Sequence, residues 1–208
     1  VIFLVTFGDP FEFIKKNIVK IPDSSKGNFV IKYFPNWSIP YLHLSRADRP
    51  TGTWLLLLPC LFGILLACIE KNNFSISFYE IWFLIACSIG AFLMRGAGCT
   101  WNDILDKDYD AKVKRTQNRP IPSGQVTIRR AIYWMIVQSL LAFTILLTFN
   151  KFSILIAFLS LLLVAIYPLA KRFTWWPQIF LGLAFNWGVL VGYLSLIHIS
   201  EPTRRYLI

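Results

Sequence analysis

Thr53-Trp-Leu-Leu-Leu-Leu-Pro-Cys-Leu-Phe-Gly-Ile-Leu-Leu-Ala-Cys-Ile69 is an uncharged and almost wholly apolar stretch. A helix of about 17–25 apolar residues is long enough to cross the hydrocarbon core of a bilayer. Four further apolar runs follow it, at Phe78–Met94, Ala131–Phe149, Phe152–Ala170 and Pro177–Ile197. We therefore predict an all-α fold, a multi-pass transmembrane helical bundle with about five spans.

The composition of the whole chain agrees with this prediction. Of its 208 residues, 56% are hydrophobic and only 15% are charged, against about 25% charged residues in an ordinary soluble domain. A soluble domain of this size cannot bury so much apolar surface in one core. The lipid bilayer is therefore the expected solvent. Gly188 and Gly192, in the last run, are spaced for close packing against another helix.

The net charge of +10 has a simple explanation in a membrane protein. The basic residues lie mostly between the apolar runs, and the strongly basic connections recur on every second side. Basic connections stay on the cytoplasmic side of a membrane, or on the matrix side in mitochondria. We place the amino end on that same side. Because the chain has no lysine-rich tail and no RNA-binding aromatic motif, we exclude nucleic acid as a partner.

The most informative polar stretch lies between the second and third runs. In a continuous helix, Asn102, Asp106 and Asp110 fall at positions i, i+4 and i+8, and Asp103 lies beside them. Asp108 points nearly the opposite way. Carboxylates on one face repel each other unless a cation lies among them. Hard oxygen ligands without His or Cys favour Mg²⁺, which commonly bridges a carboxylate to a phosphate group.

A plainer interpretation of this stretch is a solvated loop in which acids and bases balance. The acids, however, are confined, since four of the eleven acidic residues of the chain lie between Asp103 and Asp110, at a predicted membrane edge. Polar clusters at such places are functional hypotheses by default. Several basic residues follow closely and are suited to neutralising phosphate oxygens, namely Lys112, Lys114, Arg115 and Arg119.

The pattern Asn102-Asp103-x-x-Asp106-x-x-x-Asp110 resembles the first aspartate-rich motif of the UbiA superfamily of intramembrane aromatic prenyltransferases. The flanking segments are similar to its 4-hydroxybenzoate polyprenyltransferase branch, and the likeness runs from about Tyr41 to Tyr193. These segments are Arg46-Ala-Asp-Arg-Pro-Thr-Gly-Thr, Met94-Arg-Gly-Ala-Gly-Cys-Thr, Lys112-Val-Lys-Arg-Thr-Gln-Asn-Arg-Pro and Tyr167-Pro-Leu-Ala-Lys-Arg.

The resemblance implies an enzyme of ubiquinone biosynthesis that transfers a polyprenyl group from polyprenyl diphosphate to 4-hydroxybenzoate. It implies Mg²⁺ as the cofactor, held by Asn102, Asp103, Asp106 and Asp110. The implied catalytic residues are Asp106, Asp110 and Lys171. The implied substrate-binding residues are Arg46, Arg95, Asn102, Arg115, Tyr167 and Lys171; Arg46 and Arg95 are also open to a plain role as membrane-edge charges.

The resemblance also sets the expected domain organisation. We expect residues 1–44 to be disordered or interfacial, and residues 45–193 to be the amino-terminal part of a larger UbiA-type bundle. Residues 194–208 resemble translated sequencing-adaptor read-through, and we separate them as a tail of questionable origin. The family's second aspartate motif is missing, because the only acidic residue after Asp110 is Glu201. We therefore expect this sequence to be inactive by itself.

Alternatives remain at this point. The acceptor in a UbiA relative can instead be homogentisate, a naphthoate or haem. A CDP-alcohol phosphotransferase needs an Asp-Gly-x-x-Ala-Arg core, which the sequence lacks. A non-catalytic helical bundle or transporter would carry its acids inside the spans rather than at one edge. The expected location is the mitochondrial inner membrane with a matrix-facing site, or the bacterial inner membrane with a cytoplasm-facing site.

Overall fold

A computed structural model describes residues 29–70 and 77–197 of the chain, and within these ranges all regular structure is helical. In this part of the chain, five segments are long and apolar enough to cross a membrane, so the predicted fold class and number of spans are confirmed. The helices in chain order are α2 (Phe29–Tyr33), α3 (Ile39–Leu44), α4 (Thr51–Glu70), α5 (Phe78–Leu105), α6 (Lys107–Asp110), α7 (Ile128–Leu146), α8 (Lys151–Phe173), α9 (Pro177–Asn186) and α10 (Gly188–Ile197).

The helix ends differ from the predicted ends of the apolar runs. α5 continues past Met94 to Leu105. The prediction stopped at Met94 because hydropathy indicates where an apolar run ends and not where the helix ends. α7 begins at Ile128, before the predicted start, and its N-cap Thr127 accepts a hydrogen bond from the backbone N–H of Arg130. The fifth run is divided at Trp187 into α9 and α10.

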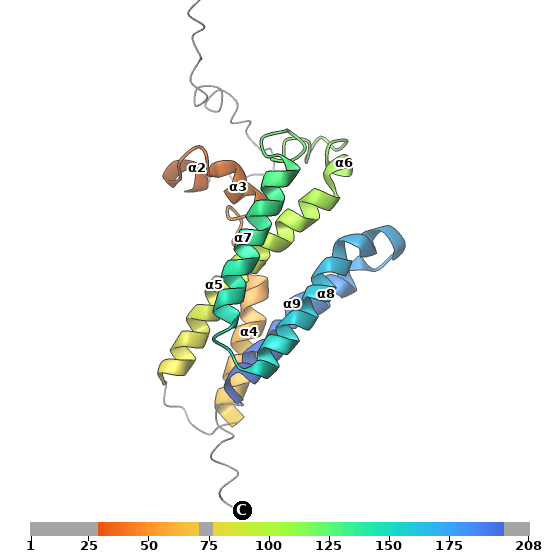
Figure 1. Ribbon diagram of the computed structural model, residues 1–208. Coiled ribbons are helices and arrows are strands. Elements are labelled where there is room, and N and C mark those ends of the chain that lie inside the picture. The colour runs from red at the N-terminus through yellow and green to blue at the C-terminus, as the bar shows by residue number, and fades with distance from the viewer. Residues whose placement is uncertain (1–28, 71–76, 198–208) are drawn as a thin grey trace, which may run out of the picture.

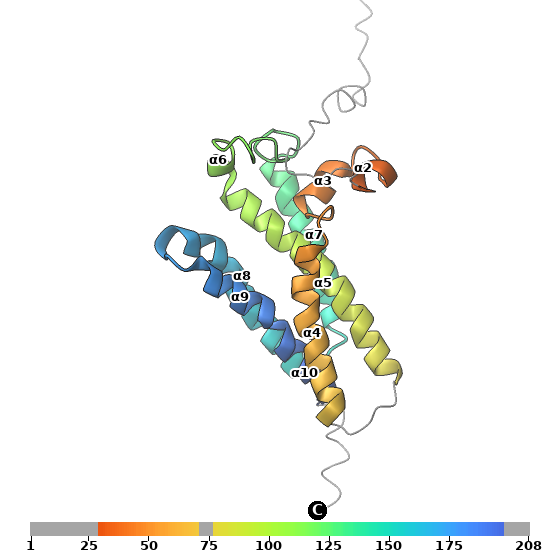
Figure 2. The same ribbon diagram turned by 180° about the vertical axis from the view of Figure 1, so that it is seen from behind.

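The helices are arranged as two leaning groups with α4 between them (Figure 1). α5 packs mainly against α7, α8 packs against α9 and α10, and α4 packs most extensively against α10 (Figure 2). The short helices α2 and α3 lie across one end of the bundle, where α6 and the α8–α9 turn are also found. The basic connections that the sequence predicts on one side of the membrane therefore lie at one end of the bundle.

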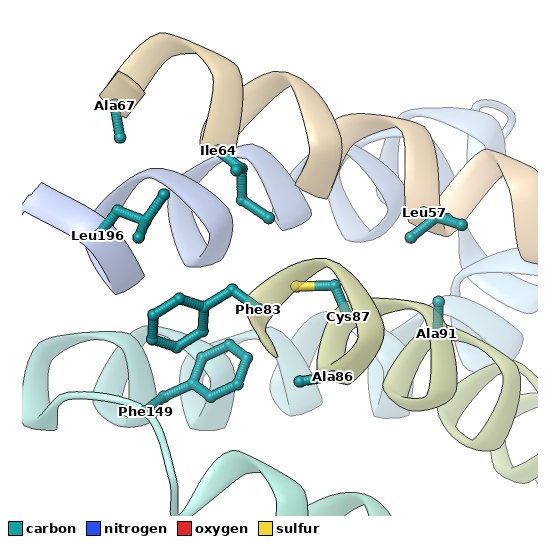
Figure 3. Close-up of a cluster of buried hydrophobic side chains, with 9 residues drawn as sticks. All are labelled: Leu57, Ile64, Ala67, Phe83, Ala86, Cys87, Ala91, Phe149 and Leu196. Carbon is teal, nitrogen blue, oxygen red and sulfur yellow. The ribbon is translucent and has the colours of Figure 1, made fainter. Parts of the chain in front are cut away.

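A hydrophobic cluster holds α4, α5 and α10 together near the opposite end (Figure 3). Phe83 of α5 meets Phe149, just after α7, with the ring centroids 4.9 Å apart and the rings edge to face. Ile64 of α4 and Leu196 of α10 are buried in the same cluster. The cluster fixes the relative positions of the helices that carry the polar residues at the other end.

Glycines allow α4 and α10 to approach closely. A Cβ atom on Gly192 would lie 2.3 Å from the carbonyl oxygen of Cys60, and one on Gly63 would lie 2.1 Å from the carbonyl oxygen of Val189. Such distances leave no room for a side chain, so the close approach predicted for Gly188 and Gly192 is confirmed. In membranes, small residues of this kind are a main source of helix association.

The predicted domain limits fall partly outside the described residues. Of residues 1–44, only 29–44 are described, and they form α2 and α3. Of the separated tail, residues 194–197 continue α10, where Ser195 and Leu196 are buried. The rest of that tail lies outside the described residues, and the division at 193 stays a prediction.

Candidate functional site

The acidic motif begins on the last turn of α5. Asn102 and Asp103 belong to α5, Asp106 forms the junction with backbone angles φ −90° and ψ 5°, and Asp110 ends α6. The expectation of one continuous helix is therefore wrong at Asp106. The spacing nevertheless survives, because the N–H of Asp106 donates to the carbonyl of Asn102 at 2.9 Å and the N–H of Asp110 donates to that of Asp106 at 2.8 Å.

Two arginines from outside the motif hold its buried carboxylates. Arg46 Nη2 donates to Asp103 Oδ1 at 2.9 Å and to Oδ2 at 3.2 Å. Arg119 Nη1 lies 3.3 Å from Asp103 Oδ1 and 2.7 Å from Asp110 Oδ2. The Asp103 side chain is only 1% exposed, and a carboxylate so deeply buried requires charged partners. Arg119 thus joins the two acids that flank the α5–α6 junction.

Arg46 occupies an unusual place in the backbone between α3 and α4. Its φ of 55° is the one positive value among the described residues other than glycine, and such a conformation costs about 1–3 kcal/mol unless its surroundings impose it. The N–H of Arg46 donates to the carbonyl of His43 at 3.1 Å. Burial lowers the pKa of Arg46, but the neighbouring Asp103 carboxylate raises it, and the net pKa lies above the ordinary value.

A third carboxylate, that of Asp48, lies in the same loop between α3 and α4. Its Oδ1 lies 3.8 Å from His43 Nδ1, and its Oδ2 lies 3.5 Å from Arg49 Nε. Burial acts to raise the pKa of Asp48, while the hydrogen bond and charge of His43 and the charge of Arg49 lower it. The balance holds the pKa of Asp48 below its usual value, so the carboxylate is ionised at neutral pH.

A cavity of about 900 Å³ opens beside this network and runs between the two groups of helices. Most of its wall is apolar, with aromatic side chains from α7, α8 and α9. One end is polar, and the residues there are Arg46, Arg49, Arg95, Asn102 and Asp103. A cationic end joined to a long apolar chamber fits an amphiphile with an anionic head and a hydrocarbon chain.

Arg95 reaches the cavity across the start of α4. A Cβ on Gly52 would lie 2.0 Å from Arg95 Cζ, so only glycine lets the guanidinium lie against α4 at this point. The Nε of Arg95 is buried without a hydrogen-bond partner in the structure. A buried donor without a partner is costly, and an anionic group at the polar end of the cavity would supply its acceptor.

The residues predicted for the site fall into two groups. Arg46, Arg95, Asn102, Asp103 and Tyr167 line the cavity together. The others are not among the described residues of the lining. Of these, Asp106 and Asp110 lie just past the polar end, the side chain of Arg115 is exposed, and the backbone of Lys171 belongs to α8 while its side chain lies outside the described parts.

The structure gives Asp103 and Arg119 more central positions than the sequence pattern indicates. Asp103, expected to assist the other acids, is the most deeply buried of the four and has two arginine partners. Arg119, expected only as one of several bases near phosphate, is 13% exposed and bridges Asp103 and Asp110.

The oxygen donors fit a divalent metal only in part. Among the described residues, no group of three or more His, Cys, Asp or Glu side chains lies close enough to hold a metal ion. Asp103 and Asp110 share the Nη1 of Arg119. The donors present, carboxylates and the amide of Asn102, are nevertheless the hard oxygens that Mg²⁺ prefers. They suit an ion that the protein binds jointly with a phosphate ligand rather than in a complete protein cage.

Comparison with known proteins places the chain in a family. Residues 56–202 match the model of the UbiA prenyltransferase family. The chain is similar to the mitochondrial 4-hydroxybenzoate polyprenyltransferases of Homo sapiens (47% identity; 79% of this chain and 43% of that protein), Bos taurus (43%; 88% and 48%) and Arabidopsis thaliana (46%; 82% and 41%).

The chain spans a little under half the length of these curated relatives. No solved structure matches the chain. The family match covers helices α5 to α10 in full, as well as most of α4 and the whole acidic motif. The chain therefore belongs to the UbiA prenyltransferase family.

Proposed function

We propose that the full-length protein transfers a polyprenyl group from polyprenyl diphosphate to 4-hydroxybenzoate, a step of ubiquinone biosynthesis. The observation that carries the proposal is the cavity, in which a cluster of arginines at one end meets a long apolar chamber. The relatives named above carry this activity in their names. Family membership supports the reaction class, and the names of the relatives support the acceptor.

The polar end supplies the groups that a diphosphate needs. Arg46 and Arg95 carry delocalised guanidinium charges at the polar end of the cavity, which would stabilise the negative charge that grows on the leaving diphosphate. We assign Arg115 and Lys171 to the same task. Members of the family generally depend on a divalent metal, and we propose Mg²⁺, held with the diphosphate by Asn102, Asp103, Asp106 and Asp110. When bound, it neutralises phosphate charge and so favours departure of the diphosphate.

The apolar wall has a different task. The allylic C–O bond of the prenyl diphosphate breaks, the freed carbon bonds to the ring carbon ortho to the phenol, and that ring carbon then loses its proton. Water would trap the allylic cation, so a chamber lined by aromatic and aliphatic side chains protects it. Tyr167, which lines the cavity from α8, presents an aromatic ring that can also stabilise the cation.

The five apolar segments make the chain a multi-pass membrane protein. Within that class, we propose the mitochondrial inner membrane as its location, because the relatives named above are mitochondrial. We propose further that the end carrying α2, α3 and α6 faces the matrix. The excess of basic residues in the connections at that end supports this orientation.

An acceptor assay tests the proposed function. Membranes carrying the full-length protein are incubated with Mg²⁺, a polyprenyl diphosphate and one acceptor at a time, namely 4-hydroxybenzoate, homogentisate, a dihydroxynaphthoate or haem. The expected product is prenylated 4-hydroxybenzoate, and its formation stops when EDTA removes the metal. Turnover with another acceptor in place of 4-hydroxybenzoate would overturn the substrate assignment.

A further inference from the structure

Ser45, the residue directly before Arg46, is held by two side chains of α7. Its Oγ accepts a hydrogen bond from Trp134 Nε1 at 2.8 Å and a second from Gln138 Nε2 at 3.0 Å. Ser45 and Gln138 are both buried, with 4% and 3% of their surfaces exposed. Trp134 and Gln138 are one helical turn apart and share a face of α7. α7 is therefore hydrogen-bonded to the loop between α3 and α4 through a single atom, Ser45 Oγ.

Gly96 of α5 and Tyr41 of α3 pack against these two hydrogen bonds and restrict their geometry. A Cβ on Gly96 would lie 2.4 Å from Gln138 Nε2 and 3.0 Å from Ser45 Cβ, so α5 leaves room for the contact only because it carries glycine there. The ring of Trp134 also packs against Tyr41 of α3, with the centroids 5.5 Å apart. Helices α3, α5 and α7 thus converge on the loop that carries Arg46.

The hydrogen bonds to Ser45 affect Arg46 because Arg46 adopts a backbone conformation that non-glycine residues disfavour. A positive φ at an arginine persists only where the surrounding contacts determine it, and Ser45 is the adjoining residue. The direction of the Arg46 side chain, and with it the 2.9 Å contact to Asp103, depends on that backbone. Neither Trp134 nor Gln138 is among the described residues that line the cavity.

We propose that Trp134 and Gln138 are positioning residues, which act through Ser45 to aim Arg46 at the polar end of the cavity. Their effect would be on the binding of a diphosphate-type anion there. The inference deepens the proposed function and rests on it for the identity of the anion. It assigns a role in substrate binding to two residues of α7 that are not among the described residues lining the cavity.

Binding of inorganic pyrophosphate tests the proposal without turnover. The full-length protein in detergent is titrated calorimetrically with pyrophosphate and Mg²⁺, beside Trp134→Phe and Gln138→Met. Both substitutions keep the approximate volume of the side chain and remove its hydrogen-bond donor. We expect about tenfold weaker binding in each variant, the size of effect that one buried hydrogen bond carries. The KM for prenyl diphosphate should rise more than kcat falls.

The chain offers a matched control at the far end of the bundle. Trp82 Nε1 donates to Thr148 Oγ1 at 3.0 Å, again a bond from an indole to a hydroxyl between segments distant in sequence. Thr148→Val removes that bond and should leave the affinity for pyrophosphate unchanged. Thermal unfolding of all variants shows which of them are folded at the temperature of the titration.

A double-mutant cycle identifies the route through Arg46. In an Arg46→Lys background, Trp134→Phe should change the affinity by less than about twofold, because residues that act in series are not additive. Equal losses in both backgrounds would overturn the route, and unchanged affinity in both folded single variants would overturn the proposal. Weakened pyrophosphate binding in a protein that prenylates no acceptor would leave the proposal standing and refute the proposed function.

Discussion

Gly192 and Gly182 offer a test of the close contact between α4 and α10. Both lie inside the helices of the fifth span, and substitution by alanine adds one methyl group to each. At Gly192 that methyl would lie 2.3 Å from the backbone carbonyl oxygen of Cys60, whereas at Gly182 it would meet nothing within 4 Å. Since a backbone atom cannot turn aside as a flexible side chain can, α4 and α10 would have to separate.

The two substitutions share the gain in helix propensity, about 1 kcal/mol for alanine over glycine. Their difference therefore isolates the clash, which for overpacking of this kind is about 1–3 kcal/mol. In a protein of this size, each 1 kcal/mol shifts the unfolding midpoint by about 2–4 °C. We expect Gly192→Ala to melt about 5 °C below Gly182→Ala when both are heated in the same detergent. Coincident unfolding midpoints would refute the close packing of α4 against α10.

Three further predictions concern the polar end. Arg119→Met should lower the free energy of unfolding, measured by denaturant titration, by about 3 kcal/mol, because it removes one partner from two buried carboxylates. As a control, Arg115→Met replaces an exposed side chain and should change the free energy of unfolding by less than about 0.5 kcal/mol. Gly52→Ala should push the Arg95 guanidinium out of its place and weaken pyrophosphate binding measured by calorimetry, and unchanged binding would contradict the role of Arg95. Because the pKa of Asp48 is lowered in the folded protein, its contribution to stability is present above its ordinary pKa of 3.8 and is lost as the pH falls through the lower folded value. The difference in unfolding free energy between the parent protein and Asp48→Asn should therefore shrink on acidification. A difference that grows would contradict the lowered pKa.

The apolar runs were sufficient to predict the class of fold and the number of spans. Hydropathy depends only on local composition, and each run is long enough to cross a bilayer on its own. The end of α5 at Leu105 could not be predicted in this way, since the helix continues past the apolar run into a polar segment. The division of the fifth span at Trp187 likewise has no signal in the apolar pattern.

The candidate site was predictable where its residues lie close together in the sequence. The i, i+4 spacing of Asn102 and Asp106 follows from helix geometry and survives the break at Asp106. The partners of Asp103 could not be predicted, because Arg46 is 57 positions away and reaches it only through the loop before α4. The bridging place of Arg119 depends on how residues 111–120 fold back, which no periodic pattern records.

The most direct test of the central claim compares three neighbouring aspartates in prenyl transfer by the full-length protein. Asp106 and Asp110 are assigned to the diphosphate site, whereas Asp108 between them has a side chain that is 80% exposed. With Mg²⁺, polyprenyl diphosphate and labelled 4-hydroxybenzoate, Asp106→Asn and Asp110→Asn should each lower kcat/KM by at least about 100-fold, as the loss of one charge-stabilising group does in other enzymes. Asp108→Asn should retain the parent activity. Equal activity in all three variants would contradict the assignment of the site.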